Sequence, residues 1–164
     1  MALLDEEIVE YWLNNKGFFC MRGVKTGHGE IDFLAIRPDK KNLECWQVEC
    51  QVSFRPIGYI GGGSIKKRNE KDVEKGVEEY IEKKFTSQKK IEKRESIISN
   101  AKWKYVLVCA EARHKVELDH FKNKGITVYR YKDILKELEE SVSQVNSTAG
   151  NIIEILRYIK RIKD

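Results

Sequence analysis

The residues best suited to chemistry lie in two neighbouring stretches, GHGEIDFLAI at 27–36 and WQVECQVSF at 46–54. In an extended strand, side chains two residues apart point to the same face of the sheet. Glu30 and Asp32 therefore share a face with apolar residues, and Glu49 and Gln51 share a face of the second stretch. Carboxylates on the interior face of a sheet are costly unless a partner compensates their charge. The pattern therefore indicates that something binds these acids.

A hairpin of these two stretches would gather Asp32, Glu49 and Gln51, together with Glu30, on one patch of sheet. Carboxylate and amide oxygens are hard ligands that suit Mg²⁺ or Mn²⁺. A divalent ion would relieve the repulsion between the carboxylates, polarise a phosphate oxygen and lower the pKa of its bound water. The alternative is a partly exposed hairpin whose polar face meets water.

Hydrophobic periodicity and turn residues predict the elements that must position these side chains. We expect helices at 4–16, 65–84, 88–99, 115–123, 132–144 and 151–162. We expect strands at 18–22, 30–37, 43–54, 103–110 and 126–131. A polar loop is expected at 23–29, and a flexible, glycine-rich stretch at 55–64.

The order of these elements, α-β-β-β-α-β-α-β-α, predicts an α/β protein with a mixed central sheet flanked by helices. The hairpin strands should pair antiparallel, and the strand–helix–strand segment at 103–131 implies a parallel, right-handed crossover. No domain boundary is apparent. We therefore expect a single domain over 1–164, with its core at 1–131 and two C-terminal helices at 132–164.

The positive charge of the chain is concentrated in one segment. Residues 65–104 hold 13 Lys and Arg against 8 Asp and Glu, an excess that equals the net charge of +5 of the whole chain. A basic segment on a neutral body suits a polyanion, and a solvated, salt-bridged helix is the alternative. The four cysteines form no CxxC pair, and no apolar run approaches 18 residues, so we expect a cytoplasmic protein with reduced thiols and no membrane partner.

Residues 5–54 resemble the PD-(D/E)xK nuclease superfamily, in particular archaeal Holliday-junction resolvases and related small bacterial nuclease-like proteins. The resemblance is carried by Glu6 in the first helix, GFF at 17–19, Arg22, GEIDFLA at 29–35 and VECQ at 48–51. It implies a restriction-endonuclease-like fold and a metal-dependent DNA endonuclease that hydrolyses phosphodiester bonds. In such enzymes the residues that correspond to Glu6, Asp32 and Glu49 bind Mg²⁺ (or Mn²⁺).

Gln51 stands where the family usually carries the lysine of its ExK motif. That lysine orients the water nucleophile and offsets charge on the phosphate, whereas a glutamine amide orients water or binds metal without bringing a charge. Some restriction enzymes of the superfamily carry ExQ and remain active. Lys66 and Lys67, after the glycine-rich stretch, and Lys25 are the candidates for a displaced lysine.

The resemblance therefore predicts catalysis by Asp32, Glu49 and Gln51, and phosphate contacts from Arg22, Lys25, His28, Lys66, Lys67 and Arg68. Duplex or branched DNA is the expected partner, and cutting both strands usually requires a two-fold homodimer. The last helix would supply that surface or pack on its own sheet. Two alternatives stay open. One is a nucleic-acid-binding module that has lost cleavage, in which Gln51 in place of the lysine reflects that loss. The other is an interaction protein with no nucleic-acid role.

Overall fold

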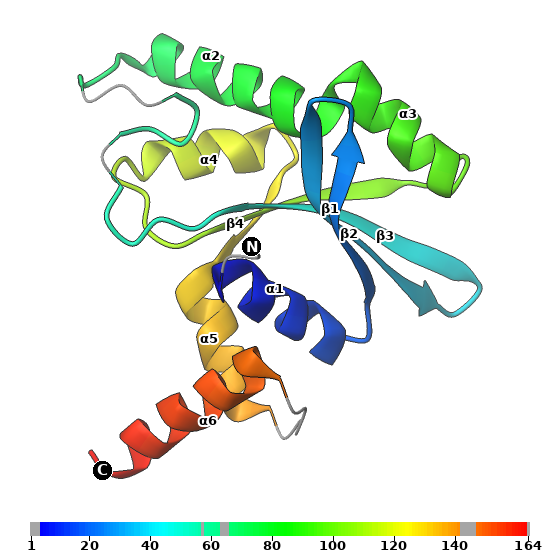
Figure 1. Ribbon diagram of the computed structural model, residues 1–164. Helices are drawn as coiled ribbons and strands as arrows, with labels where there is room; N and C mark the ends of the chain where they lie inside the picture. Colours follow the sequence, from blue (N-terminus) through cyan, green and yellow to red (C-terminus); the bar gives the residue numbers. More distant parts are fainter. Residues whose placement is uncertain (1–3, 57, 63–65, 142–146, 164) are drawn as a thin grey trace.

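A five-stranded sheet lies between two layers of helices in the computed structural model, which describes residues 4–56, 58–62, 66–141 and 147–163 (Figure 1). The strands lie in chain order across the sheet: β1 (Phe19–Thr26), β2 (Gly29–Asp39), β3 (Asn42–Gln51), β4 (Trp103–Cys109) and β5 (Thr127–Arg130). The first three pair antiparallel, and β3–β4 and β4–β5 pair parallel. The predicted α/β fold with a mixed sheet is confirmed.

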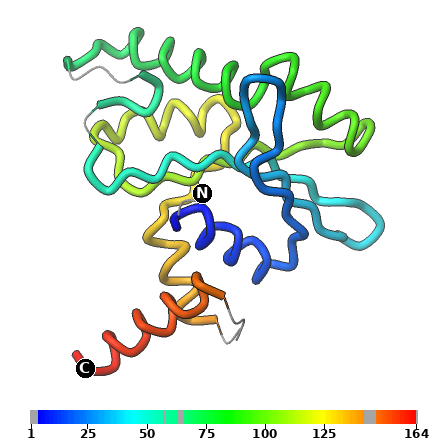
Figure 2. Tube along the Cα trace, viewed as in Figure 1, coloured from blue at the N-terminus to red at the C-terminus, as the bar shows by residue number. Residues whose placement is uncertain are grey.

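Each face of the sheet has its own set of helices, as the tube in Figure 2 traces. One face is covered by α1 (Leu4–Asn15) and α5 (Tyr131–Glu140), with α6 (Thr148–Arg161) packed against these two helices. The other face is covered by α2 (Glu70–Ile81), a π-helical turn η1 (Glu82–Thr86), α3 (Gln88–Ile97) and α4 (Val116–Asn123). No helix in the described ranges is long and apolar enough to cross a membrane.

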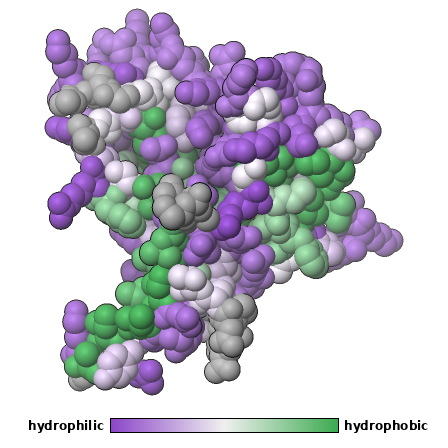
Figure 3. All heavy atoms as spheres, viewed as in Figure 1, coloured by the Kyte–Doolittle hydropathy of each residue, from purple (hydrophilic) through white to green (hydrophobic). Residues whose placement is uncertain are grey.

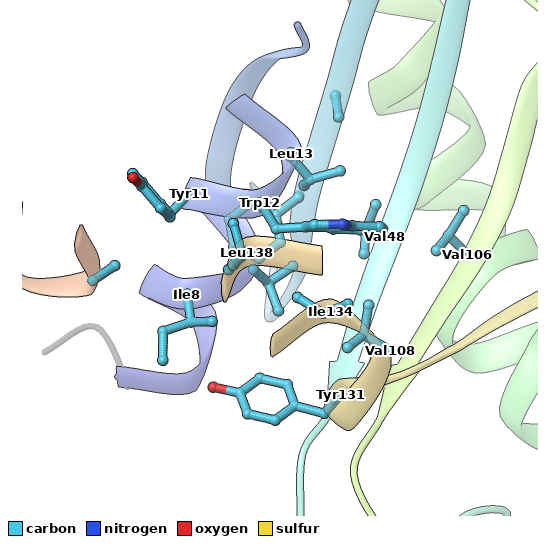
Figure 4. Packing of buried hydrophobic residues seen from close by; sticks show 14 of the residues in the cluster. Ile8, Tyr11, Trp12, Leu13, Val48, Val106, Val108, Tyr131, Ile134 and Leu138 are labelled. Atoms are coloured by element: carbon cyan, nitrogen blue, oxygen red, sulfur yellow. The ribbon is translucent and has the colours of Figure 1, made fainter. Parts of the chain in front are cut away.

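The larger hydrophobic core fills the space between the sheet and α1 and α5. Trp12 and Leu13 of α1 and Ile134 of α5 pack there against Val48 and Val106 of the sheet (Figure 4). Fully burying one such side chain contributes roughly 1.5–3 kcal/mol. A smaller core on the opposite face joins α2, η1 and α4 to β4 and includes Val77, Phe85, Leu107 and Phe121. Because β3 alternates, Trp46 and Val48 enter the larger core, while Gln47 and Glu49 face the α2–α3 side.

Several element boundaries differ from the predictions, and local hydrogen bonds explain them. The expected loop at 23–29 is mostly strand, because β1 pairs with β2 up to Thr26–Gly29 and turns at Gly27, whose φ is +75°. The helix expected over 65–84 begins at Glu70, where the Asn69 side chain caps it by accepting from the Asp72 N–H. Ser147 likewise starts α6 earlier than predicted, by accepting from the Gly150 N–H. Residues 65 and 142–144 of the predicted helices lie outside the described ranges.

Part of the stretch expected to be flexible, 55–64, is held by specific contacts at residues 60 and 61. The backbone N–H groups of Ile60 and Gly61 donate to the buried carboxylate of Glu117 at 2.9 and 2.8 Å. Gly61 also packs against Gly76 of α2, where a Cβ on Gly61 would lie 2.5 Å from the Gly76 carbonyl oxygen. These contacts hold residues 60 and 61 against α2 and α4. Gly63, the last of the three consecutive glycines, lies outside the described residues.

Candidate functional site

Asp32 and Glu49 lie on the same face of the sheet, on adjacent strands. Leu34 and Gln47 are register partners, so the residues two positions away on each strand, Asp32 and Glu49, share their face. The last pair of the β2–β3 ladder at this end is Phe33–Val48, and just beyond it Asp32 Oδ2 accepts from the Cys50 N–H at 2.7 Å. Glu49 is fully buried, whereas Asp32 remains 8% exposed. The two carboxylates therefore form the inner and outer parts of one site.

Two lysines from the opposite helices bind the buried carboxylate of Glu49. Lys90 of α3 lies 2.8 Å from Oε1, and Lys84 of η1 lies 3.2 Å from Oε2. The Gln47 amide also donates to Oε1, at 2.9 Å. Lys90 is buried as deeply as a core residue, while the Lys84 side chain is 29% exposed. The interior charge of Glu49 is thus compensated by two ammonium groups, as a buried carboxylate requires.

A buried arginine holds the π-helical turn that carries Lys84. Arg94 of α3 donates to the side-chain oxygen of Gln47, to the Phe85 carbonyl oxygen at 2.7 Å and to the Tyr105 hydroxyl at 3.0 Å. The Gln47 amide in turn donates to the Lys84 carbonyl oxygen at 2.7 Å. Single π-helical turns within helices are frequent at functional sites. The turn is thus held to Gln47 of β3 at the Lys84 carbonyl oxygen and, through Arg94, at the Phe85 carbonyl oxygen.

The electrostatics of the site centre on Asp32. Burial raises the pKa of Glu49, the charge of Asp32 raises it further, and the opposing effects of Lys90 and Lys84 do not cancel the rise. Burial likewise raises the pKa of Glu6 on α1, with Asp32 the next contributor. Burial works to lower the pKa of Lys84, but the charges of Glu49 and Asp32 outweigh it and raise this pKa overall. The charge of Asp32 thus contributes to the pKa shifts of Glu49, Glu6 and Lys84 alike.

A cation bound at Asp32 would have few protein ligands. Within the described part of the chain, no three His, Cys, Asp or Glu side chains converge as a group that could hold a metal ion. Mg²⁺, however, is commonly held by one or two carboxylates together with substrate phosphates and water, rather than by an all-protein cage. Asp32, whose repulsion by Glu6 and Glu49 a cation would relieve, fits that mode of binding.

A hollow of about 340 Å³ opens beside Asp32. The β1–β2 turn forms one wall with His28, Gly29 and Glu30, and η1 with the start of α3 forms the other. Its basic lining comprises Lys83, Lys84, Lys89 and Lys90. Asp32 thus faces a space with a surplus of positive charge, which suits a phosphate group.

The structure separates other predicted site residues from this hollow. Gln51 is exposed and lines a different hollow, together with Ser53, Tyr59 and Glu111. Arg22 pairs with Glu10 at 2.9 Å, and the guanidinium of Arg68 lies over the Tyr59 ring. Lys66 and Lys67 are exposed residues ahead of α2.

Lys25 and His28 lie close to the hollow. Lys25 pairs with Glu30 at 2.5 Å, and His28 lines the hollow beside Asp32. A hydrogen bond from Lys25 lowers the pKa of Glu30, so Glu30 is already partnered at the rim.

Sequence reasoning missed Lys84, Lys90 and Arg94, the basic residues that contact Glu49 and Gln47. Hydrophobic patterning concealed the last two, because α3 buries Lys90 and Arg94 while its Ile91 is exposed. One signal was available: residues four apart share a helix face, and a buried acid at position 49 requires basic partners.

No protein-family model, curated protein or solved structure matches this chain. A proposal for its function therefore rests on the fold and on the geometry of the site.

Proposed function

We propose that this protein is a metal-dependent DNA endonuclease that hydrolyses phosphodiester bonds. One observation carries the proposal: Lys84 contacts Glu49 and lines the same hollow as Asp32, on the same face of the sheet. Phosphodiester hydrolysis needs oxygen ligands for a cation and a positive charge near the phosphate, and these residues supply both. A restriction-endonuclease-like form of the α/β fold belongs to the same proposal.

The residues take distinct roles in this proposal. Asp32, with Glu6 and Glu49, would hold Mg²⁺ or Mn²⁺, which when bound polarises the scissile phosphate and lowers the pKa of a bound water. Lys84 stabilises the charge that develops on the phosphate, the role that the resemblance gave to position 51. Gln51 lies in another hollow, so we assign it no contact with the reacting phosphate. The Lys89 and His28 side chains bind the DNA backbone that flanks the scissile phosphate.

Cleavage assays on duplex and four-way-junction DNA test this proposal. Mg²⁺ or Mn²⁺ should support cutting, and Asp32→Asn should abolish it while circular dichroism shows a retained fold. Asp133→Asn, which changes an exposed aspartate on α5, is the matched control and should cut as wild type does. Cutting that persists in EDTA or in folded Asp32→Asn would reject the proposal.

A nucleic-acid-binding module without cleavage is the second candidate, and the state of Glu49 favours it. Both oxygens of this carboxylate already accept hydrogen bonds from lysines, so its charge is balanced without a metal ion. Salt-sensitive DNA binding, without cleavage in either metal ion, would select the module over the enzyme.

A homodimer is part of the proposal only if both strands of a duplex are cut. The exposed face of α6, formed by Ile155, Tyr158 and Ile159 and continued by Ile162 just after the helix, is available for such contact. In Figure 3 this helix is the green, hydrophobic projection at the lower left.

A further inference from the structure

A second hollow continues the one that contains Asp32. It also measures about 340 Å³ and is lined by Lys25, Thr26, Gly27, Lys89, Glu92 and Lys93. Thr26 and Lys89 line both hollows, so the two adjoin at these residues. We call the two adjoining hollows, which extend from Lys93 past Lys89 to Asp32, the lysine groove.

The lysine groove has two close walls. Figure 1 shows the β1–β2 turn beside the junction of α2 and α3, and the Lys89 side chain reaches from α3 to this turn, since a Cβ on Gly27 would lie 3.5 Å from Lys89 Nζ. Lys89 and Lys93 follow each other by one turn of α3, about 6 Å along the helix axis. Asp32 is only 8% exposed and lines the hollow between this turn and α3. One extended chain can approach it there, whereas a duplex presents a wide rod with a backbone on each side.

The charges along the lysine groove favour a polyanion. Six lysines line it, and the acids among its lining residues are Glu30, Asp32 and Glu92. Three of the lysines are engaged locally, since Lys84 and Lys90 pair with Glu49 and Lys25 pairs with Glu30. Lys83, Lys89 and Lys93 still exceed the remaining acids, Asp32 and Glu92, so the groove attracts successive phosphates.

We propose that the lysine groove binds a single strand of nucleic acid by its phosphates and leads that strand to Asp32. This inference rests on the proposed function, because it names the form of the substrate at the same site. The groove residues that the structure describes include no Phe, Tyr or Trp, so bases have no aromatic platform and binding is independent of sequence. A single-stranded end or branch is then the substrate form that reaches the carboxylates.

The test measures binding of fluorescently labelled 12-nucleotide single strands, oligo-dT and a mixed sequence, across a salt series in EDTA. Each phosphate contact contributes about 0.7 to the slope of log affinity against log salt for single strands. The double variant Lys89→Ala/Lys93→Ala should therefore reduce the slope by about 1.4. Lys132→Ala/Lys136→Ala, which removes the same charge from exposed positions on α5, should leave the slope unchanged.

The outcomes separate this inference from the proposed function. Equal changes in the salt slope of the two double variants, or no change in either, would overturn the proposal that the lysine groove binds the strand. Tighter binding of a 12-base-pair duplex than of the single strands would overturn the single-strand form. Binding is measured in EDTA and so does not depend on cleavage. Loss of cleavage in Asp32→Asn with an unchanged salt slope would support the proposed enzyme and would leave the inference about the lysine groove as it stands.

Discussion

The Lys90 ammonium lies 2.8 Å from Oε1 of Glu49, and both side chains are buried between α3 and β3. A lysine is rarely buried without a charged partner, and the carboxylate needs the lysine equally. This pair joins the sheet to the helix that carries the basic wall of the hollow, so it connects the stability of the fold to the site.

Replacing Lys90 should destabilise the protein strongly. Lys90→Met leaves Glu49 buried with Lys84 as its remaining cation, so we expect a loss of about 3 kcal/mol, at the lower end for a broken buried pair. Urea unfolding gives the value. The neighbouring exposed change, Lys89→Met, should cost less than about 0.5 kcal/mol.

A double-mutant cycle isolates the Lys90–Glu49 interaction. Lys90→Met/Glu49→Gln should be more stable than Lys90→Met alone, because the unpaired charge is gone. Additive losses in the double variant would show that the two residues do not interact.

Lys84 should matter more for cleavage than for folding. Its side chain is 29% exposed, so Lys84→Met leaves the core intact, but it removes the positive charge beside the proposed phosphate position. We expect the single-turnover rate of cleavage to fall about 10²–10³-fold, as when one stabilising donor of an active site is lost. Lys83→Met, its exposed neighbour, should fall far less, and equal losses in both would refute a specific role for Lys84.

The titration of Glu49 and Glu6 should depend on Asp32. Burial and the charge of Asp32 raise the pKa of both glutamates above the usual 4.5. Metal binding needs both carboxylates ionised, so as the pH is lowered, binding should begin to weaken at a pH above 4.5. Because the raised pKa reflects a cost of ionisation in the folded state, the stability contributed by these groups falls as pH rises through the folded pKa.

Carbon-13 NMR of the glutamate carboxyl carbons can follow this titration. In Asp32→Asn the midpoints of Glu6 and Glu49 should both move down, because a neighbouring negative charge is absent. Unchanged midpoints would show that Asp32 lies too far away to act on them.

The contact between Gly61 and Gly76 should tolerate no side chain. A Cβ at either glycine would lie 2.5 Å from the carbonyl oxygen of the other, and backbone atoms yield little. Gly61→Ala should cost about 1–3 kcal/mol, the usual range for overpacking. Gly29→Ala, whose Cβ would meet nothing nearer than Thr26 Oγ1 at 3.4 Å, is the control for thermal unfolding. Equal stability of the two variants would show that the segment moves away freely.

The amino-acid sequence determined the order of helices and strands and the alternation on β3. Side chains alternate along a strand with a fixed period of two. Spacing therefore placed Glu49 and Val48 on opposite faces of the sheet, and one hairpin turn placed Glu49 on the same face as Asp32. Local hydrogen bonds such as the Asn69 cap then decided boundaries that periodicity leaves open.

Only the tertiary structure decided which basic residues reach the carboxylates. Sequence placed the candidates at Lys25, Lys66 and Lys67, whereas Lys84 and Lys90 contact Glu49, more than thirty positions away along the chain. Nothing in the local pattern distinguishes a buried lysine from a solvated one, because both occur on charged helices. The packing of α3 and η1 on β3, with Arg94 holding the turn, selects these two lysines and buries one of them.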